Sequence, residues 1–255
     1  MKKINDAFLN KKAFIAYLMA GDPNLTVSAE YILTAQNAGA DMIEIGIPFS
    51  DPIAEGEVIQ AASIRAIAAG TRLDGVFDMV ASIKDKIRIP MVFMTYLNPI
   101  FVYEYDRFFA KCAEIGVCGV IIPDMPFEEQ GEAKEIAKKY DVDVITLVAP
   151  TSENRIREIA LHAEGFLYLV SSMGVTGIRR EITTDLSSIV ADIRKSTDIP
   201  VAVGFGISAP AQAAHYATIA DGVIVGSAIV NIIAQHGNEA HEHLCKYIDE
   251  MKSSI

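Results

Sequence analysis

Residues 41–47 read DMIEIGI, a run of apolar side chains with one carboxyl group inside it. A short, continuous apolar run with β-branched residues is typical of a strand covered on both faces, as in parallel sheets. Because side chains alternate along a strand, Glu44 shares one face with Met42 and Gly46, opposite Ile43 and Ile45. The pattern predicts a buried strand that carries Glu44 near its carboxyl end.

Runs of the same kind recur along the chain, separated by amphipathic segments. Most of these segments carry apolar residues at helical spacing, and several end at a glycine, as helices commonly do. The other predicted strands are Phe14–Met19, Ile89–Thr95, Val117–Ile122, Val142–Val148, Gly165–Val170, Pro200–Val203 and Gly222–Val225. The predicted helices are Ser28–Gly39, Val58–Gly70, Leu73–Lys86, Asp106–Gly116, Glu128–Tyr140, Glu153–His162, Thr184–Thr197 and Pro210–Ile219.

Eight strand–helix units in 255 residues predict an α/β protein, a (β/α)8 TIM barrel that spans residues 1–255 as a single domain. Lys2–Lys11 is predicted to add a helix before the first strand. The alternative is an open, doubly wound sheet, whose dinucleotide-binding form has a glycine fingerprint after its first strand. No such fingerprint stands there, since Gly204-Phe205-Gly206 follows the seventh strand and lacks the third glycine. The barrel is therefore favoured.

Charge and composition exclude several classes of partner. The chain has 22 Lys and Arg against 33 Asp and Glu, a net charge of −11, which argues against a nucleic acid or an anionic membrane surface. No apolar stretch approaches the roughly 18 residues of a membrane span, and the first residues lack the apolar core of a signal peptide. The three cysteines form no Cys-x-x-Cys pair, as is typical of reduced thiols. We expect a cytoplasmic protein.

Glu44 is the clearest candidate for acid–base chemistry. The loops after the carboxyl ends of the strands form the active-site face of a TIM barrel, and Glu44 should point into that opening. Apolar surroundings favour the neutral carboxyl and raise its pKa, which suits proton transfer near pH 7. The next loop offers a second carboxyl group from Asp51, Glu55 or Glu57, and the sequence pattern leaves the choice among them open.

Three glycine-containing loops predict a phosphate site. They are Gly174-Val175-Thr176-Gly177, Gly204-Phe205-Gly206 and Gly226-Ser227, which follow the sixth, seventh and eighth strands. Glycines let main-chain amides approach an anion, and the last loops of such barrels commonly hold phosphate at the N-terminus of a helix.

The residues needed for Schiff-base or metal-assisted catalysis are not found where such catalysis would require them. A Schiff-base lysine should stand on an inward strand face, but every lysine falls in a predicted helix, a loop or a terminus. The histidines likewise fall in helical stretches or near the C-terminus, so no metal site is expected. The remaining prediction is cofactor-free acid–base chemistry on a phosphorylated substrate.

Several motifs resemble the tryptophan synthase α chain family, in order and over nearly the whole length. They are YLMAGDP at 17–23, IEIGIPFSDP at 43–52, GVTG at 174–177 and GFGIS at 204–208. The resemblance implies a TIM barrel that cleaves indole-3-glycerol phosphate to indole and glyceraldehyde 3-phosphate without a cofactor of its own. It also implies a partner, the β chain, which carries pyridoxal phosphate and receives the indole in an αββα assembly.

By position, the resemblance makes Glu44 the acid–base residue of a retro-aldol cleavage. The family's second carboxyl group, which engages the indole N–H, falls at Glu55. The commoner sequence there is Ala-Asp-Gly-Pro, whereas this chain has Ala54-Glu55-Gly56-Glu57. One methylene moves a carboxyl group by about 1 Å, enough to cost roughly a hundredfold in rate if nothing adjusts. This departure leaves open a largely non-catalytic subunit that activates a β chain, and the fold alone leaves open a phosphosugar isomerase.

The resemblance also assigns the remaining site residues. Thr176 corresponds to a lid residue, and Asp51 and Pro52 belong to the surface that contacts the β chain. The phosphate is assigned to Gly177, Gly206, Gly226 and Ser227. The indole pocket is assigned to Tyr17, Met94, Ile121, Leu147, Tyr168 and Phe205.

Overall fold

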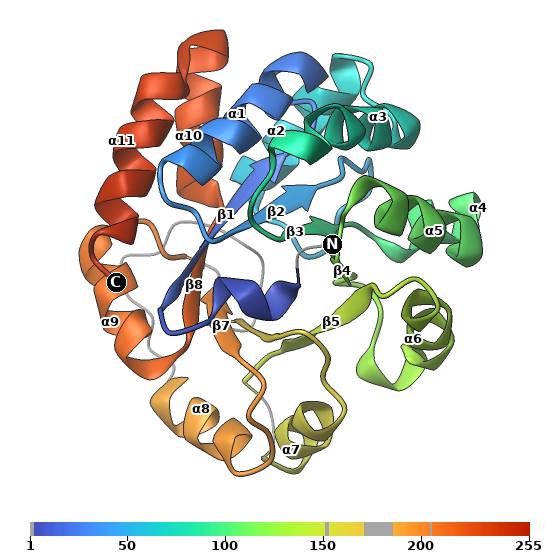
Figure 1. Ribbon diagram of the computed structural model, residues 1–255, viewed down its shortest axis with the longest axis vertical. Coiled ribbons are helices and arrows are strands. Elements are labelled where there is room, and N and C mark those ends of the chain that lie inside the picture. Colours follow the sequence, from blue (N-terminus) through green and yellow to red (C-terminus); the bar gives the residue numbers. More distant parts are fainter. Residues whose placement is uncertain (1–2, 151–152, 171–185, 205) are drawn as a thin grey trace.

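The computed structural model describes residues 3–150, 153–170, 186–204 and 206–255. In them, eight parallel strands pair in chain order and β8 closes on β1, which confirms the predicted TIM barrel (Figure 1). Since all strands run in one direction, their carboxyl ends meet at one end of the barrel, called the mouth below; the opposite end is called the base. The strands are β1 (Ala13–Met19), β2 (Met42–Gly46), β3 (Met91–Met94), β4 (Gly119–Ile121), β5 (Asp143–Val148), β6 (Leu167–Val170), β7 (Val201–Gly204) and β8 (Gly222–Val225).

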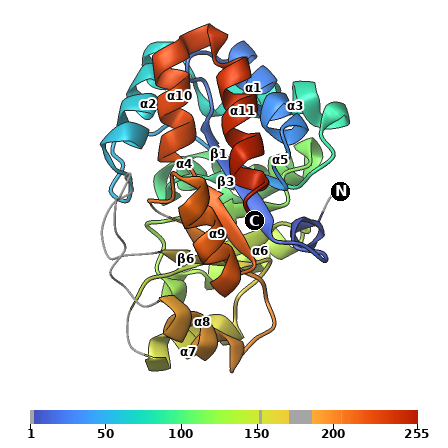
Figure 2. The same ribbon diagram turned by 90° about the vertical axis from the view of Figure 1, so that its left-hand side faces the viewer.

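Helices surround the barrel as an outer ring (Figure 1). They are α1 (Leu25–Asn37), α2 (Glu57–Ala68), α3 (Leu73–Ile83), α4 (Leu97–Tyr103), α5 (Tyr105–Ile115), α6 (Gly131–Lys138), α7 (Glu153–Leu161), α8 (Leu186–Arg194), α9 (Pro210–Ile219), α10 (Ser227–His236) and α11 (His241–Lys252). Figure 2 shows α10 and α11 side by side, and α11 also packs on α1.

Most helix boundaries lie within a few residues of the prediction. Helix α1 begins three residues early because the side chain of Asn24 caps it, accepting a hydrogen bond from the amide of Val27 at 3.0 Å. The predicted ranges leave out three helices: α4, which is only two turns long, and α10 and α11, which follow the last strand. The helix expected over Lys2–Lys11 is present as a single 3-10 turn, Ile4–Ala7, which lies across the base of the barrel (Figure 1).

The strands separate two apolar layers, as the alternation along residues 41–47 predicts. Ile43 and Ile45 belong to the outer layer, between the strands and the helices. Met42 belongs to the inner layer, with Tyr17 and Met94 from the neighbouring strands. Glu44 therefore stands on the inner face of β2, where an apolar side chain would be the rule.

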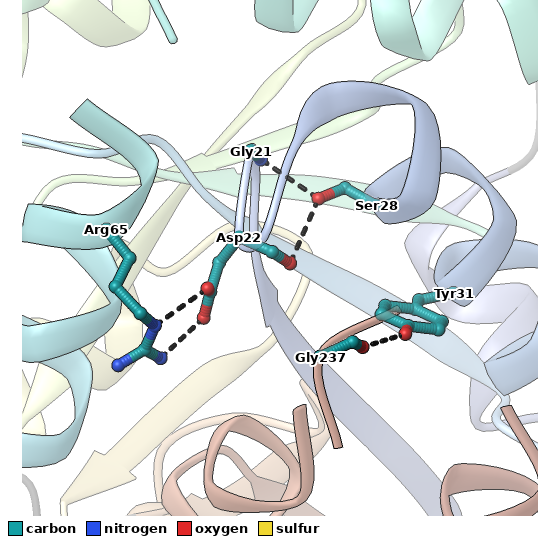
Figure 3. A network of polar contacts seen from close by, with 6 residues as sticks. All are labelled: Gly21, Asp22, Ser28, Tyr31, Arg65 and Gly237. Carbon is teal, nitrogen blue, oxygen red and sulfur yellow. Dashed lines mark hydrogen bonds and ion pairs between the residues drawn. The ribbon is translucent and has the colours of Figure 1, made fainter. Parts of the chain in front are cut away.

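A polar network fixes the loop that follows β1 (Figure 3). The carboxylate of Asp22, which is 2% exposed, accepts two hydrogen bonds from the guanidinium group of Arg65 on α2, at 2.9 and 2.7 Å. The hydroxyl of Ser28 accepts from the amide of Gly21 at 3.0 Å and donates to the carbonyl of Asp22 at 3.3 Å. A paired Arg–carboxylate contact of this kind has a defined geometry, so it holds α2 against the first loop.

Candidate active site

Glu44 is buried at the mouth of the barrel. On β2 it is paired with Tyr17 of β1 and Val92 of β3, and its side chain is only 1% exposed. Among the residues that the structure describes, neither carboxyl oxygen has a hydrogen-bond partner. Burial, and after it the nearby charge of Glu55, raise the pKa of Glu44 to about 8. The group therefore carries its proton at neutral pH.

Glu55 brings the second carboxyl group to the same pocket from the loop between β2 and α2. Its side chain is 5% exposed, whereas Asp51 and Glu57 of the same loop are exposed. Burial raises the pKa of Glu55 to about 7, although a hydrogen bond with Tyr96 opposes the rise. Of the three carboxyl groups between which the sequence pattern could not choose, only Glu55 lines the pocket.

Tyr96, just after β3, organises this loop and was missed by the sequence analysis. Its hydroxyl accepts hydrogen bonds from the amides of Ile53 and Ala54, at 3.1 and 3.0 Å. Its ring stacks on Phe49 with the centroids 5.1 Å apart. The hydroxyl that bonds Glu55 is therefore itself fixed by the loop, so the position of Glu55 depends on Tyr96.

The two carboxyl groups share one largely apolar pocket. Its lining includes six predicted site residues besides them: Tyr17, Met94, Tyr168, Gly206, Gly226 and Ser227. It also includes Ile59, Ile207 and Ile224, which the sequence analysis did not select. Ile224 was accessible to sequence reasoning because it stands on the inner face of β8 by the alternation rule. The cavity volume is about 30 Å³, room for one or two water molecules, so the pocket must widen to admit a larger ligand.

Other predicted pocket residues lie elsewhere or outside the described residues. Ile121 is fully buried in the inner apolar layer, and Leu147 packs against that layer, but neither lines the cavity. Phe205, Thr176 and Gly177 lie outside the residues that the structure describes.

Two tyrosines reach into the pocket over glycines of the neighbouring strand. A Cβ atom on Gly46 would stand 2.1 Å from the hydroxyl oxygen of Tyr17. A Cβ atom on Gly204 would stand 2.5 Å from the ring of Tyr168. Any side chain at either glycine would displace a tyrosine, so the two glycines are required for the shape of the pocket.

The helix N-termini at the mouth differ in what they offer an anion. At α9, the side chain of Gln212 already accepts from the amides of Ser208 and Ala209, at 2.9 and 3.1 Å. At α10, which begins at Ser227, the N-cap residue is Gly226, which has no side chain with which to cap the helix. Uncapped amides and the positive end of the helix dipole favour a negative group, so α10 is the better anion site.

The described residues contain neither a metal site nor a membrane span. No group of three or more His, Cys, Asp and Glu side chains in the described ranges is placed to hold a metal ion. No helix in the part of the chain that the structure covers is long and apolar enough to cross a membrane.

The fold and the pocket define a TIM-barrel protein in which two buried carboxyl groups and the N-terminus of a helix line one pocket, an arrangement suited to acid–base chemistry on an anionic substrate. The model of the tryptophan synthase alpha chain family matches residues 4–254. The chain belongs to this family, as its motifs indicated.

Individual relatives agree with the family match. The tryptophan synthase alpha chain of Lacticaseibacillus casei is 46% identical over 100% of this chain and 96% of its own length. A structure of Mycobacterium tuberculosis tryptophan synthase superposes with a TM-score of 0.91 at 32% identity, covering 100% of this chain and 98% of that one. A chain from the tryptophan synthase α2β2 complex of Pyrococcus furiosus gives a TM-score of 0.85 at 35% identity, covering 95% and 99%.

Proposed function

We propose that this chain is a lyase of tryptophan biosynthesis that cleaves indole-3-glycerol phosphate to indole and glyceraldehyde 3-phosphate. The observation that carries the proposal is the pairing of Glu44 and Glu55 in one apolar pocket that ends at the N-terminus of α10. Apolar walls suit an indole ring, two carboxyl groups of raised pKa suit proton transfer, and main-chain amides suit a phosphate ester.

Glu44 performs the proton transfers in this mechanism. With its pKa at about 8, it is protonated at neutral pH and donates to the ring carbon that bears the glycerol chain. The resulting carboxylate then accepts the proton of the hydroxyl on the adjoining chain carbon. The carbon–carbon bond breaks, its electron pair returns to the ring, and the hydroxyl oxygen becomes the aldehyde oxygen. Indole and the aldehyde leave together, and no redox partner is needed.

Glu55 stabilises the charge that the first step creates. Protonation of the ring carbon makes the indole nitrogen positive. A carboxylate that accepts a hydrogen bond from the ring N–H lowers the energy of that state. With its pKa at about 7, Glu55 is substantially ionised at neutral pH, as this role requires. The burial of its carboxyl group in the pocket favours this catalytic role over the alternative of a largely non-catalytic subunit.

The phosphate end of the substrate is assigned to the other side of the pocket. The amides of Gly206, Gly226 and Ser227 provide the donors, and Gly177 adds a fourth by position in the sequence. Thr176 closes over the bound substrate, and Phe205 adds to the indole pocket. Excluding water around Glu44 strengthens every electrostatic interaction in the site.

The partner is the tryptophan synthase β chain, which holds the pyridoxal phosphate; this chain needs no cofactor of its own. Asp51 and Pro52 belong to the contact surface in an αββα assembly. The side chain of Ile53, next to Pro52 in the chain, supports this choice, because it is 71% exposed and exposed apolar surface marks interaction sites. A cytoplasmic location fits the three cysteines, which are all unpaired.

The direct test supplies the purified chain with indole-3-glycerol phosphate. We expect release of indole and glyceraldehyde 3-phosphate in equal amounts. Glu44→Gln should release indole at least about a hundredfold more slowly, while still binding an indole that carries an unsubstituted propyl phosphate chain. If the wild-type chain binds this analogue and cleaves nothing, with and without a β chain, the proposed activity is wrong.

A further inference from the structure

The hydroxyl of Tyr17 is a polar group inside the pocket for which the mechanism above has no use. The side chain is 4% exposed and lines the cavity. Within the described part of the chain its oxygen has no hydrogen-bond partner. Burial, followed by the charges of Glu55 and Glu44, raises the pKa of Tyr17 well above its ordinary value, so the group stays a neutral phenol that can donate and accept.

The ring of Tyr17 spans the pocket from the phosphate side to the carboxyl side. Its root is near Gly226, where a Cβ atom would stand 3.4 Å from the Cβ of Tyr17. Its tip is over Gly46, two residues beyond Glu44 on β2, and Tyr17 is the β1 partner of Glu44 in the sheet register. The hydroxyl therefore lies between the anion site and the catalytic carboxyl group, on the side of Glu44.

A buried hydroxyl without a partner lowers the stability of the folded protein. Phenylalanine would fill the same space without this cost. Of the described side chains, Thr95 also has a buried, unpartnered hydroxyl, but it does not line the cavity. The hydroxyl of Tyr17 is thus the one of the two that a ligand in the pocket can reach.

We propose that the hydroxyl of Tyr17 hydrogen-bonds a hydroxyl group of the substrate's glycerol chain, and so selects substrates with an oxygenated chain between ring and phosphate. The inference rests on the proposed function, which places the ring at the two glutamates and the phosphate at α10. The chain between them must then pass the tip of Tyr17. Because a hydroxyl both donates and accepts, it is the group that matches a neutral phenol.

The test compares Tyr17→Phe with the wild type on two ligands. One is indole-3-glycerol phosphate; the other is the analogue with an unsubstituted propyl phosphate chain, which has no hydroxyl for Tyr17 to bond. We expect kcat/KM for the substrate to fall about tenfold, the factor that corresponds to about 1.4 kcal/mol. We expect the inhibition constant of the analogue to stay within about twofold of the wild type, since ring packing is kept.

Thermal unfolding separates this role from a structural one. Tyr17→Phe removes a polar group without a partner, so its Tm should equal or exceed that of the wild type. Tyr31→Phe is the matched control, because the hydroxyl of Tyr31 is fully partnered: it donates to the carbonyl of Gly237 (Figure 3) and accepts from the amide of Ala240 at 3.2 Å. This control should lower Tm and leave both kinetic constants unchanged.

Three results would overturn the proposal: unchanged kcat/KM in Tyr17→Phe, an equal loss of affinity for both ligands, or a lowered Tm. The second result would show that the ring acts through packing, and the first that a water molecule satisfies the hydroxyl in the free and bound states alike. If the wild type binds both ligands and cleaves neither, the proposed function fails. The ratio of the two dissociation constants then still tests Tyr17.

Discussion

The mouth and the base of the barrel both place carboxyl groups beside a cavity, and at both ends burial raises the pKa of at least one of these groups. At the mouth the pKa of Glu44 is raised to about 8; at the base the pKa of Asp143 is raised to about 6 by burial and then by the charges of Glu164 and Asp141. The base cavity is the larger, at about 770 Å³ against about 30 Å³.

The difference lies in what surrounds each carboxyl group. At the base, the positive charges of Lys3 and Lys134 oppose the rise in the pKa of Asp143, and the group is partly exposed. At the mouth, Glu44 has apolar neighbours, no hydrogen bond within the described residues, and the N-terminus of α10 in the same pocket. A raised pKa therefore marks any carboxyl group that burial deprives of water. A catalytic group also needs a place for the substrate's charge and ring.

The largest difference in activity should appear when one carboxyl group is neutralised at each end of the barrel, in separate variants. Glu44→Gln removes the proton donor, so kcat should fall by roughly 10²- to 10⁴-fold, the usual contribution of general acid–base catalysis. Asp143→Asn makes the same chemical change at the base and should leave kcat/KM unchanged. Steady-state assays of indole release measure both. Similar losses of activity in the two variants would contradict a catalytic role that belongs to Glu44 and not to Asp143.

Within the mouth, shortening Glu55 tests how closely the loop is fitted to glutamate. Glu55→Asp withdraws the carboxyl group from Tyr96 by about 1 Å, so kcat/KM should fall by about tenfold to a hundredfold. The same assay detects it. A large gain instead would mean that this chain's loop is poorly adapted for catalysis, and would favour the non-catalytic alternative.

The pH dependence of kcat/KM should be bell-shaped, since Glu55 acts ionised and Glu44 acts protonated. Activity should rise as pH approaches about 7 and fall above about 8, the pKa values of the two groups. Because the groups interact, each limb belongs to the pair. Tyr96→Phe should move the acid limb to higher pH, since the hydrogen bond with Tyr96 holds the pKa of Glu55 down. Tyr31→Phe should move neither limb, and an unshifted acid limb in Tyr96→Phe would contradict the role given to Tyr96.

The two ends of the barrel should affect the pH dependence of stability in the same direction. Glu44 binds its proton more tightly when folded, with a pKa of about 8 against 4.5, so the stability that this proton supplies is lost as pH rises from 4.5 to about 8. The stability supplied by the proton of Asp143 is lost at lower pH, between 3.8 and about 6. Relative to the wild type, Glu44→Gln should gain on the order of a few kcal/mol in unfolding free energy from pH 5 to 9. Asp143→Asn should gain less, and mostly below pH 6.5. Urea unfolding at several pH values measures both, and parallel pH curves for all three proteins would refute the assigned pKa shifts.

Much of the fold followed from local pattern because burial leaves a periodic trace in sequence. The continuous apolar runs predicted all eight strands, and alternation along residues 41–47 predicted that Glu44 faces inward. Short elements left too weak a trace: α4 was missed, and the N-terminal helix is only a 3-10 turn. The predicted helix ranges also left out α10 and α11, which follow the last strand. The choice of Glu55 over Asp51 and Glu57 rested on family resemblance, because three carboxyl groups in one loop have no periodicity to separate them.

By itself the sequence determined the order and burial of the strands, the inward direction of Glu44 and the absence of a dinucleotide fingerprint, because each depends on residues close together in the chain. Tertiary structure alone decided that the hydroxyl of Tyr96 holds Glu55 in the pocket, that Gln212 occupies the start of α9 while α10 stays uncapped, and that the hydroxyl of Tyr17 has no partner within the described residues. These are relations between atoms that the barrel brings together from distant strands and loops. Hydrogen bonding and desolvation act over a few ångströms of space, whatever the separation along the chain.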